Sequence, residues 1–194
     1  MQETSPDPQA GKAEWRSWLR QITDRKTPPR QQSAAICETL SRRLAKTPPC
    51  RIASFAALPD EPSLLELIHS FPQHRWSLPR VVGSDLVFHE VDHPEQLRSG
   101  AFSIAEPLSD RPILPTHRID IFLCPGLGFD RRGIRLGRGK GFYDRALAHA
   151  KPEAERIGIT FSEQLVDRLP SDAHDIPMTL VISGSGEMMD LNRP

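Results

Sequence analysis

The chain has 194 residues and carries 25 lysines and arginines against 25 aspartates and glutamates, a formal net charge of zero at pH 7. This balance argues against a protein coated with positive charge for nucleic acid, and the length suits one domain whose core needs no disulfide or metal. The three cysteines are widely spaced and form no Cys-x-x-Cys pair, which argues against a disulfide framework or a zinc ribbon. The first residues lack the regions of a secretory signal, and no apolar run approaches the roughly 18 residues of a membrane span. We therefore expect a cytoplasmic protein that does not bind membranes.

The first part of the chain is predicted to be helical. Residues 1–11 are polar and contain prolines, and we expect them to form a flexible arm ahead of a single domain over residues 12–194. A first helix is indicated by apolar residues spaced three and four apart: Trp15, Trp18, Leu19 and Ile22. A second helix is predicted over residues 31–46, because Pro28-Pro29 and Pro48-Pro49 interrupt the chain on either side.

Short apolar segments then alternate with short helices. Six segments are predicted to be strands: residues 51–58, 76–82, 86–91, 119–123, 157–161 and 180–183. Helices are predicted over residues 64–71 and from about Gly141 onward. Strands that alternate with helices predict an α/β fold with a largely parallel sheet.

A segment rich in glycine and arginine follows the strand predicted over residues 119–123. This glycine-rich segment, residues 125–145, holds six of the chain's 12 glycines, five arginines and one lysine. Glycine lets backbone N–H groups approach an anion closely, and arginine and lysine supply the charge that phosphate oxygens need. Because ligands of α/β sheets collect at the carboxyl ends of strands, the segment is interpreted as a phosphate-binding site. A solvated loop or an RNA-binding Arg/Gly segment is the alternative.

Two common nucleotide-binding loops do not match the glycine-rich segment. A Walker A sequence requires Ser or Thr after its Gly-Lys pair, where this chain has Gly141. The Gly-x-Gly-x-x-Gly pattern fails as well, because Arg131 and Phe142 stand where the third glycine belongs. A phosphate site here therefore needs another pattern to identify it.

Such a pattern is present. The sequence Leu136-Gly-Arg-Gly-Lys-Gly-Phe-Tyr-Asp144, preceded by Pro125-Gly-Leu-Gly-Phe-Asp130, resembles the signature of the 5-formyltetrahydrofolate cyclo-ligase family, also called methenyltetrahydrofolate synthetases. Other segments resemble the family in the same order along the chain: residues 12–16, 55–61, 78–80, 104–107, 158–165 and 174–175. The resemblance extends over roughly residues 12 to 182. It implies a three-layer α/β/α sandwich around a six-stranded, largely parallel sheet.

The resemblance also implies a particular reaction. The family converts 5-formyltetrahydrofolate to 5,10-methenyltetrahydrofolate with Mg-ATP, and releases ADP and phosphate. The formyl oxygen takes the γ-phosphoryl group, and attack by N10 then closes the ring as phosphate leaves. ATP is required because an amide oxygen leaves poorly whereas phosphate leaves well. The partners would be small molecules only, without nucleic acid, and we expect a monomer.

The resemblance assigns the phosphates of ATP to positive side chains and glycine amides. Arg135, Arg138 and Lys140 are the expected catalytic residues, because they can neutralise the charge on the transferred phosphoryl group. The residues expected to bind ATP are Lys12, Arg16, Arg135, Gly137, Arg138, Gly139, Lys140, Gly141, Phe142 and Tyr143. Lys12 and Arg16 lie one helical turn apart and point the same way, although a solvated helix face would give the same pattern.

Acidic and aromatic residues complete the expected site. Asp144 and Asp175 are the predicted Mg²⁺ ligands, because this ion prefers carboxylate oxygens. Relatives usually carry a second Asp four residues after the His-Asp pair, where this chain has Thr179. The folate contacts implied by the resemblance are Ala56, Glu61, Phe102, Arg138 and Phe142. A carboxylate among them suits the N–H donors of a pterin ring.

Most of the histidines lie outside these motifs. Six of them show no spacing typical of metal ligands: His69, His74, His89, His93, His117 and His149. The sequence therefore predicts no metal site on these side chains.

Two other functions stay open. A paralogue with the same ATP site could act on a different N-formyl or pterin-like substrate. A non-catalytic nucleotide- or RNA-binding protein could use the glycine-rich segment without turnover. Glu61, Asp144 and Asp175 favour an enzyme, because carboxylates have no use in a segment that only binds RNA.

Overall fold

The computed structural model describes residues 5–7, 9–22, 26–100 and 104–191. Its helices are α1 (Lys12–Gln21), α2 (Pro29–Leu44), α3 (Glu66–Ser70) and α4 (Phe142–Ala148), with short 3₁₀ helices η1 (Pro94–Gln96), η3 (Thr116–Arg118) and η4 (Ser162–Gln164). The predicted helices are present, and each lies within two or three residues of the predicted bounds. Proline at the start of α2 is tolerated because the first amide of a helix has no partner to lose.

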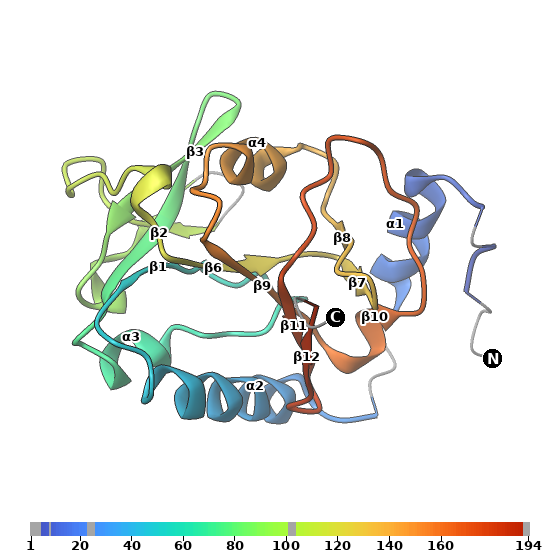
Figure 1. Cartoon of the computed structure of the whole chain (residues 1–194), viewed down its shortest axis with the longest axis horizontal. Coiled ribbons are helices and arrows are strands. Elements are labelled where there is room, and N and C mark those ends of the chain that lie inside the picture. The colour runs from blue at the N-terminus through green and yellow to red at the C-terminus, as the bar shows by residue number, and fades with distance from the viewer. Residues whose placement is uncertain (1–4, 8, 23–25, 101–103, 192–194) are drawn as a thin grey trace.

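The central sheet has seven strands in the order β12-β11-β9-β6-β1-β2-β3. The strands are β1 (Arg51–Ala53), β2 (Arg75–Val82), β3 (Asp85–Glu90), β6 (Ile121–Pro125), β9 (Glu155–Ile159), β11 (Leu180–Ile182) and β12 (Met188–Asp190). Neighbouring strands are parallel from β11 to β2, whereas β12 and β3 pair antiparallel at the two edges (Figure 1). The predicted α/β fold with a largely parallel sheet is confirmed.

The prediction of six strands is wrong by one. All six predicted segments contribute a strand, and the seventh is β12, which returns from β11 through a turn at Gly186. Met188 in this strand is 46% exposed, so the strand lacks the apolar alternation by which a buried strand is predicted. Backbone hydrogen bonds to β11 hold β12 at the edge of the sheet.

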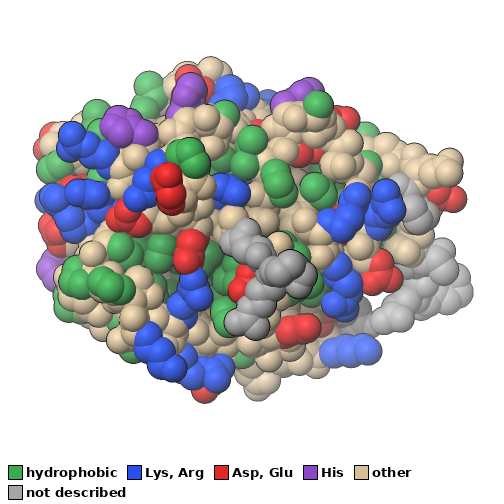
Figure 2. All heavy atoms as spheres, viewed as in Figure 1, with side chains coloured by type: hydrophobic (Ala, Val, Ile, Leu, Met, Phe, Trp, Pro, Cys, Tyr) green, Lys and Arg blue, Asp and Glu red, His purple; other side chains and the backbone are tan. Residues whose placement is uncertain are grey.

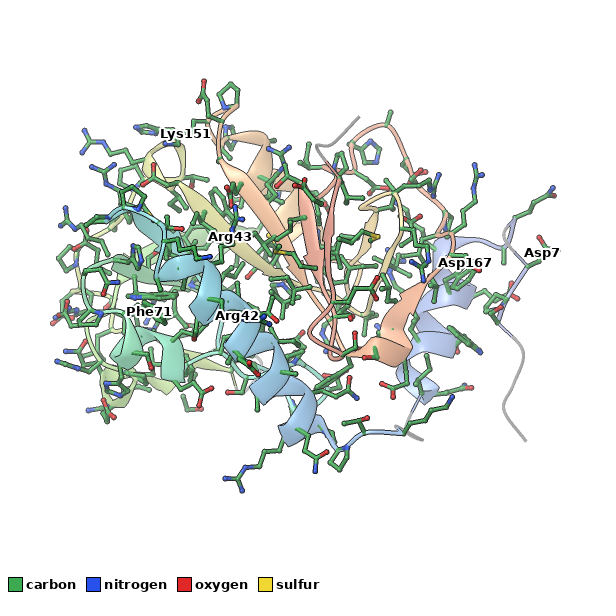
Figure 3. The ribbon with its side chains drawn as sticks, turned by 60° about the horizontal axis from the view of Figure 1, so that its bottom comes forward. Asp7, Arg42, Arg43, Phe71, Lys151 and Asp167 are labelled. Atoms are coloured by element: carbon green, nitrogen blue, oxygen red, sulfur yellow. The ribbon has the colours of Figure 1, made fainter. Side chains whose placement is uncertain are left out.

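Helices cover both faces of the sheet. α2 and α3 lie on one face, where Leu40 and Leu67 share a core cluster with Leu123 of β6. α4 lies on the opposite face, where Leu147 shares a second cluster with Phe122. Consecutive residues of β6 thus point to opposite faces, as the strand period requires. Figure 3 shows α2 running across its face of the sheet with α3 beside it, which completes the three layers expected.

The glycine-rich segment, in which the sequence predicted no strand, is partly a hairpin. It forms β7 (Gly128–Asp130) and β8 (Arg135–Leu136), and β10 (Leu165–Val166) pairs beside β7 to make a three-stranded sheet. α1 covers this small sheet by packing Trp15 and Leu19 against Leu136. β4 (Arg98–Ser99) and β5 (Ala105–Glu106) form a separate pair. The glycine-rich segment is therefore held at both of its ends by packed structure.

Asp130 explains why the segment turns back on itself. Its side chain is fully buried, and its Oδ1 accepts hydrogen bonds from the backbone N–H groups of Arg132 and Ile134, both at 2.9 Å. Its Oδ2 accepts from the Arg132 guanidinium at 2.6 Å and from the N–H of Leu169 at 3.0 Å. These donors satisfy both oxygens of the buried carboxyl group. Asp130 and Arg132 are therefore structural residues of the segment.

Positive and negative side chains are interspersed over the face of the molecule in Figure 2. The charge balance of the sequence thus holds locally over this face, with basic and acidic groups beside one another. Within the part of the chain that the structure describes, no helix has both the length and the apolar character needed to span a bilayer.

Candidate functional site

A pocket of about 610 Å³ lies where several parallel strands end. Its walls come from the segments that follow β1 and β6, from α1, and from β2, β3 and β5. This is the expected place for a ligand in an α/β sheet, and the volume is in the range of small-molecule sites. The chain leaves the sheet after Ala53, earlier than the predicted end of the strand at residue 58, and residues 55–61 form one wall.

The structure brings the predicted site residues to this one pocket. It is lined by Lys12, Arg16, Ala56, Glu61, Arg135, Gly137, Arg138, Gly139, Lys140, Gly141, Phe142, Tyr143, Asp144 and Asp175. Phe102, the other predicted folate contact, lies outside the described residues. The roles assigned to these side chains stay predictions, but their convergence from four parts of the chain is a property of the fold.

The glycine-rich segment supplies the cationic wall. Gly139 and Gly141 have φ of 98° and 67°, a region that residues with a Cβ rarely adopt. These two glycines therefore allow the backbone to turn into the pocket on either side of Lys140. Lys140 is exposed at the pocket and forms no hydrogen bond or ion pair with any described residue. It is free to meet an anionic ligand.

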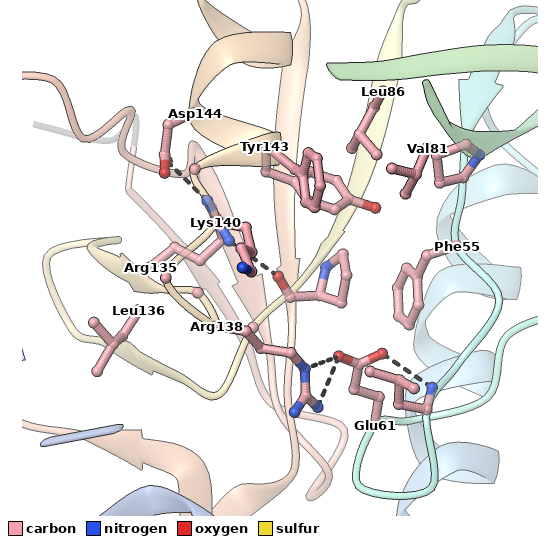
Figure 4. A pocket seen from close by; sticks show the side chains of 18 of the residues that line it. Phe55, Glu61, Val81, Leu86, Arg135, Leu136, Arg138, Lys140, Tyr143 and Asp144 are labelled. Atoms are coloured by element: carbon pink, nitrogen blue, oxygen red, sulfur yellow. Dashed lines mark hydrogen bonds and ion pairs between the residues drawn. The ribbon is translucent and has the colours of Figure 1, made fainter. Parts of the chain in front are cut away.

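Arg135 is fixed more firmly than the other cations. Its side chain is only 5% exposed, and its Nη2 donates to Asp144 Oδ1 at 2.8 Å. Its guanidinium also stacks over the ring of Tyr143, 5.3 Å from the centroid (Figure 4). Arg135 therefore presents a positive charge of fixed position, and it ties α4 to the strand that precedes it.

Arg138 and Glu61 face each other across the pocket (Figure 4). The Nη2 of Arg138 lies 3.2 Å from Glu61 Oε1 and 2.5 Å from Asp60 Oδ1. The second oxygen of Glu61 accepts from the backbone N–H of Leu58 at 3.1 Å. Burial raises the pKa of Glu61, although these donors favour its ionised form. The carboxyl group of Glu61 thus lies at the inner wall of the pocket, and Arg138 links it to the cationic wall.

Lys12 of α1 binds two acids from the other end of the chain. Its Nζ lies 2.6 Å from Asp175 Oδ2 and 2.8 Å from Asp172 Oδ2. Partial burial opposes the charge of Lys12, but the hydrogen bonds to these carboxylates outweigh it and raise the pKa of Lys12. Arg16, one turn further, donates to the backbone oxygen of Gly137 at 2.9 Å. Both side chains of this helix face therefore point into the site, and the alternative of a solvated helix face is wrong.

An apolar surface faces the charged wall. It is formed by Phe55, Ala56, Leu58, Pro79, Val81, Leu86, Ile104, Phe142 and Tyr143. The hydroxyl of Tyr143 is buried within this surface and has no hydrogen-bond partner among the described residues. Burial raises the pKa of Tyr143 well above its ordinary value, so the hydroxyl stays protonated. A buried donor without a partner is costly, and a ligand that accepts its hydrogen bond would satisfy it.

The acids proposed for Mg²⁺ are suited to share the ion with phosphate. Asp144 and Asp175 both line the pocket and supply hard oxygen donors. Each is paired with a cation, Arg135 and Lys12 respectively, so neither is an isolated buried charge. Mg²⁺ in nucleotide sites commonly takes one or two carboxylates and completes its shell with phosphate oxygens and water. These residues fit the ion under that arrangement.

Three acidic residues of the site had no role in the sequence analysis. Asp60 and Asp172 were missed because a carboxylate that holds a cation in place has no local sequence signal. Glu106 lines the pocket although it is 4% exposed, and it accepts from the N–H of Val81 at 3.2 Å. Its only signal was its place in the Ile104-Ala-Glu-Pro107 segment.

Thr179 has a structural position. Its hydroxyl donates to the backbone oxygen of Arg156 at 3.2 Å and accepts from the N–H of the same residue at 2.9 Å. Thr179 is not one of the described residues that line the pocket. The Thr179 hydroxyl thus joins β9 to the segment before β11.

The fold and the pocket define an α/β protein with a cationic wall and an apolar wall at the carboxyl edge of a parallel sheet. Comparison with known families agrees with this description and makes it specific. The model of the 5-formyltetrahydrofolate cyclo-ligase family matches residues 8–184. The chain belongs to this family.

Individual relatives show the same likeness. The chain is 42% identical over 93 residues to a 5-formyltetrahydrofolate cyclo-ligase of Mycolicibacterium smegmatis, a match that covers 46% of this chain and 47% of that protein. It is 38% identical over 96 residues to the Escherichia coli K12 protein of that name, which covers 48% of this chain and 53% of that protein. The matched part thus spans about half the length of these curated relatives.

Solved structures agree over a greater length. The 5,10-methenyltetrahydrofolate synthetase of Aquifex aeolicus superposes with a TM-score of 0.82 at 28% identity, over 94% of each chain. The synthetase of Mycoplasma pneumoniae superposes with a TM-score of 0.72 at 22% identity, over 94% of this chain and 100% of that chain, which supports the fold alone.

Proposed function

We propose that the protein converts 5-formyltetrahydrofolate to 5,10-methenyltetrahydrofolate, with hydrolysis of ATP to ADP and phosphate. One observation carries the proposal: Arg138 lies between the cationic wall of a single pocket and the buried carboxylate of its apolar wall. The reaction transfers a phosphoryl group from ATP to a planar acceptor that carries N–H donors. The cationic wall and the apolar wall must therefore adjoin each other. Membership of the family makes the folate the natural acceptor.

The phosphates of ATP would bind along the glycine-rich segment and α1. Lys140 and Arg16 line the pocket beside the backbone of Gly139 and Gly141. A phosphoryl group in transfer carries its charge on peripheral oxygens, and fixed cations around it stabilise that charge. Arg138 would contribute on the side that faces the second substrate.

The folate would bind against the apolar surface. Phe55, Val81 and Leu86 give a pterin ring faces to pack on, and Glu61 accepts from its N–H donors. Glu61 accepts a hydrogen bond from Arg138 in the present arrangement. Folate binding would replace the arginine with the pterin as the partner of this carboxylate. The released guanidinium would then be available for the phosphoryl group.

The steps of the reaction use this arrangement. The formyl oxygen would attack the γ-phosphoryl group, with ADP as the leaving group, and Arg138 would neutralise charge between the two. N10 would then attack the activated carbon, and phosphate would leave with the former formyl oxygen. Mg²⁺ held by Asp144 and Asp175 would supply further charge neutralisation on the phosphates.

The test is to mix purified protein with Mg-ATP and 5-formyltetrahydrofolate and follow the absorbance of the methenyl product together with ADP. We expect product that depends on both substrates, with one ADP for each ring closed. Folded protein that binds ATP but gives no methenyl product would refute the proposal, and it would leave either a different N-formyl substrate or binding without turnover. Protein that hydrolyses ATP only with another N-formyl compound would support the first of these.

A further inference from the structure

The fold brings together two histidines and a glutamate outside the pocket. Potential ligand atoms of His69, His93 and Glu95 all lie within 4.8 Å of one another. Nε2 of His69 is 3.1 Å from Oε1 of Glu95, and the rings of the two histidines lie with centroids 5.7 Å apart. We propose that these three side chains form a binding site for a transition-metal ion of the Zn²⁺ type.

The cluster is built on packed structure although its side chains are exposed. His69 lies near the end of α3, whose Leu67 and Ile68 are buried in the core. His93 and Glu95 flank Pro94, which starts η1 and fixes the φ of the turn. The backbone positions of the three residues are therefore fixed by packed structure.

The turn that carries Glu95 is closed by further contacts. Arg98 donates through Nη1 to the backbone oxygens of Glu95, at 2.9 Å, and Leu97, at 2.8 Å. Val91 and Leu97 at the ends of the turn pack on the same core cluster as α3. α3 and this turn are thus anchored to one core, and a metal ion would join them at the surface.

The chemistry of the three side chains selects the ion. Two imidazoles and one carboxylate suit Zn²⁺ and neighbouring transition metals, whereas Mg²⁺ and Ca²⁺ prefer oxygen ligands throughout. Around a tetrahedral zinc ion, ligand atoms lie about 3.4 Å apart, which is close to the present separation of His69 and Glu95. A potential ligand atom of His93 lies within 4.8 Å of those of His69 and Glu95, and water would take the fourth position.

His69, His93 and Glu95 do not line the pocket, so the site is independent of the folate chemistry proposed above.

The site is tested by titrating untagged protein with Zn²⁺ in millimolar Mg²⁺, which keeps the carboxylates of the pocket occupied. Calorimetry should give one bound Zn²⁺ for each chain, and loss of a ligand in His69→Ala, His93→Ala or Glu95→Gln should weaken it at least about tenfold. His117→Ala, which removes an exposed histidine elsewhere, should bind zinc as the unmodified protein does. Co²⁺ should give visible absorption bands that the three variants lose.

Two results would overturn the proposal. One is unmodified protein that takes up no zinc, and the other is the same affinity in all three ligand variants as in His117→Ala. Far-ultraviolet circular dichroism of each variant checks that its fold is unchanged, which we expect because the substituted side chains are exposed. Zn²⁺ should also raise the melting temperature of the unmodified protein and of His117→Ala, and leave that of His93→Ala unchanged.

Discussion

Glu61 and Arg138 lie 77 positions apart in the sequence, and Oε1 of the acid is 3.2 Å from Nη2 of the arginine across the pocket. Each member of this pair has a second partner. Glu61 accepts from the N–H of Leu58, and Arg138 donates to Asp60. The pair can therefore separate when substrates bind without leaving either charge alone, which suits groups that exchange partners during a reaction.

Replacing Arg138 should abolish most of the turnover. The substitution Arg138→Ala removes a cation that would face charge in the transition state, and we expect kcat to fall at least about 100-fold. The side chain is partly exposed, so the melting temperature should change little. Arg131→Ala is the matched control, because Arg131 belongs to the same segment but pairs with Asp167 at the surface. Similar kcat values for the two variants would remove Arg138 from the chemistry.

Replacing Glu61 should separate the two substrates. In Glu61→Ala the folate loses a charged acceptor worth about 1.5–3 kcal/mol, and KM for the folate should rise roughly ten- to a hundredfold. KM for ATP should stay within about twofold of the original value, since the carboxylate lies on the apolar side. Steady-state kinetics with each substrate varied in turn measures both. An equal rise for ATP would contradict the pterin contact.

Glu61 should also make stability depend on pH. Its pKa is higher in the folded protein than the ordinary 4.5, because it is buried. The folded state therefore holds its proton more tightly than the unfolded state, and the stability associated with that proton is present below pH 4.5 and lost as the pH rises. The melting temperature of Glu61→Gln minus that of the unmodified protein should thus increase from acidic to neutral pH. Glu153→Gln, at an exposed site, should show no such trend.

Lys12 should matter for ATP and for the closure of the pocket. Lys12→Met keeps most of the side-chain volume but removes the charge that holds Asp172 and Asp175. We expect weaker binding of ATP by at least about tenfold, with the affinity for the folate unchanged. Arg20→Met places the same substitution on the exposed side of α1 and should leave both affinities intact. Calorimetric titration of each variant with ATP and with the folate measures both affinities. Unaltered ATP binding in Lys12→Met would contradict the role of Lys12.

Asp130 should be needed for folding and have no direct part in catalysis. Asp130→Ala leaves three backbone N–H groups and the partly exposed guanidinium of Arg132 without their acceptor, at a cost of about 3–5 kcal/mol in the free energy of unfolding. Urea denaturation should show this loss, whereas Asp167→Ala, at a carboxylate 97% exposed, should unfold as the original protein does. A stable Asp130→Ala variant would show that the hairpin folds without its acid.

The regular elements were predictable because their signals are local. The apolar stripe of α1 and the buried runs of the six strands each lie within one short stretch of sequence. The same holds for the glycine-rich segment, whose composition and resemblance led to the pocket. β12 was not predicted because only its pairing with β11 at the edge of the sheet defines it as a strand. Met188 in this strand is exposed, so no buried apolar pattern indicates it.

The missed parts of the site depend on contacts between distant segments. Asp130 accepts from Leu169, 39 positions away, and no local pattern indicates that its charge is buried. Asp60 and Asp172 were indistinguishable from surface acids until the fold placed Arg138 and Lys12 beside them. The histidines had no ligand spacing in the sequence because α3 and the turn after β3 meet only in the folded protein.

The contact between Lys12 and Asp175 spans 163 positions of the chain. During synthesis the first helix leaves the ribosome long before its acidic partners are made. Trp15 and Leu19 cannot pack until the small sheet that α1 covers has also been made. The pocket is therefore completed only after Asp175 has been made. We expect nascent chains that end before Asp175 to lack ATP binding, however much of their sheet has formed.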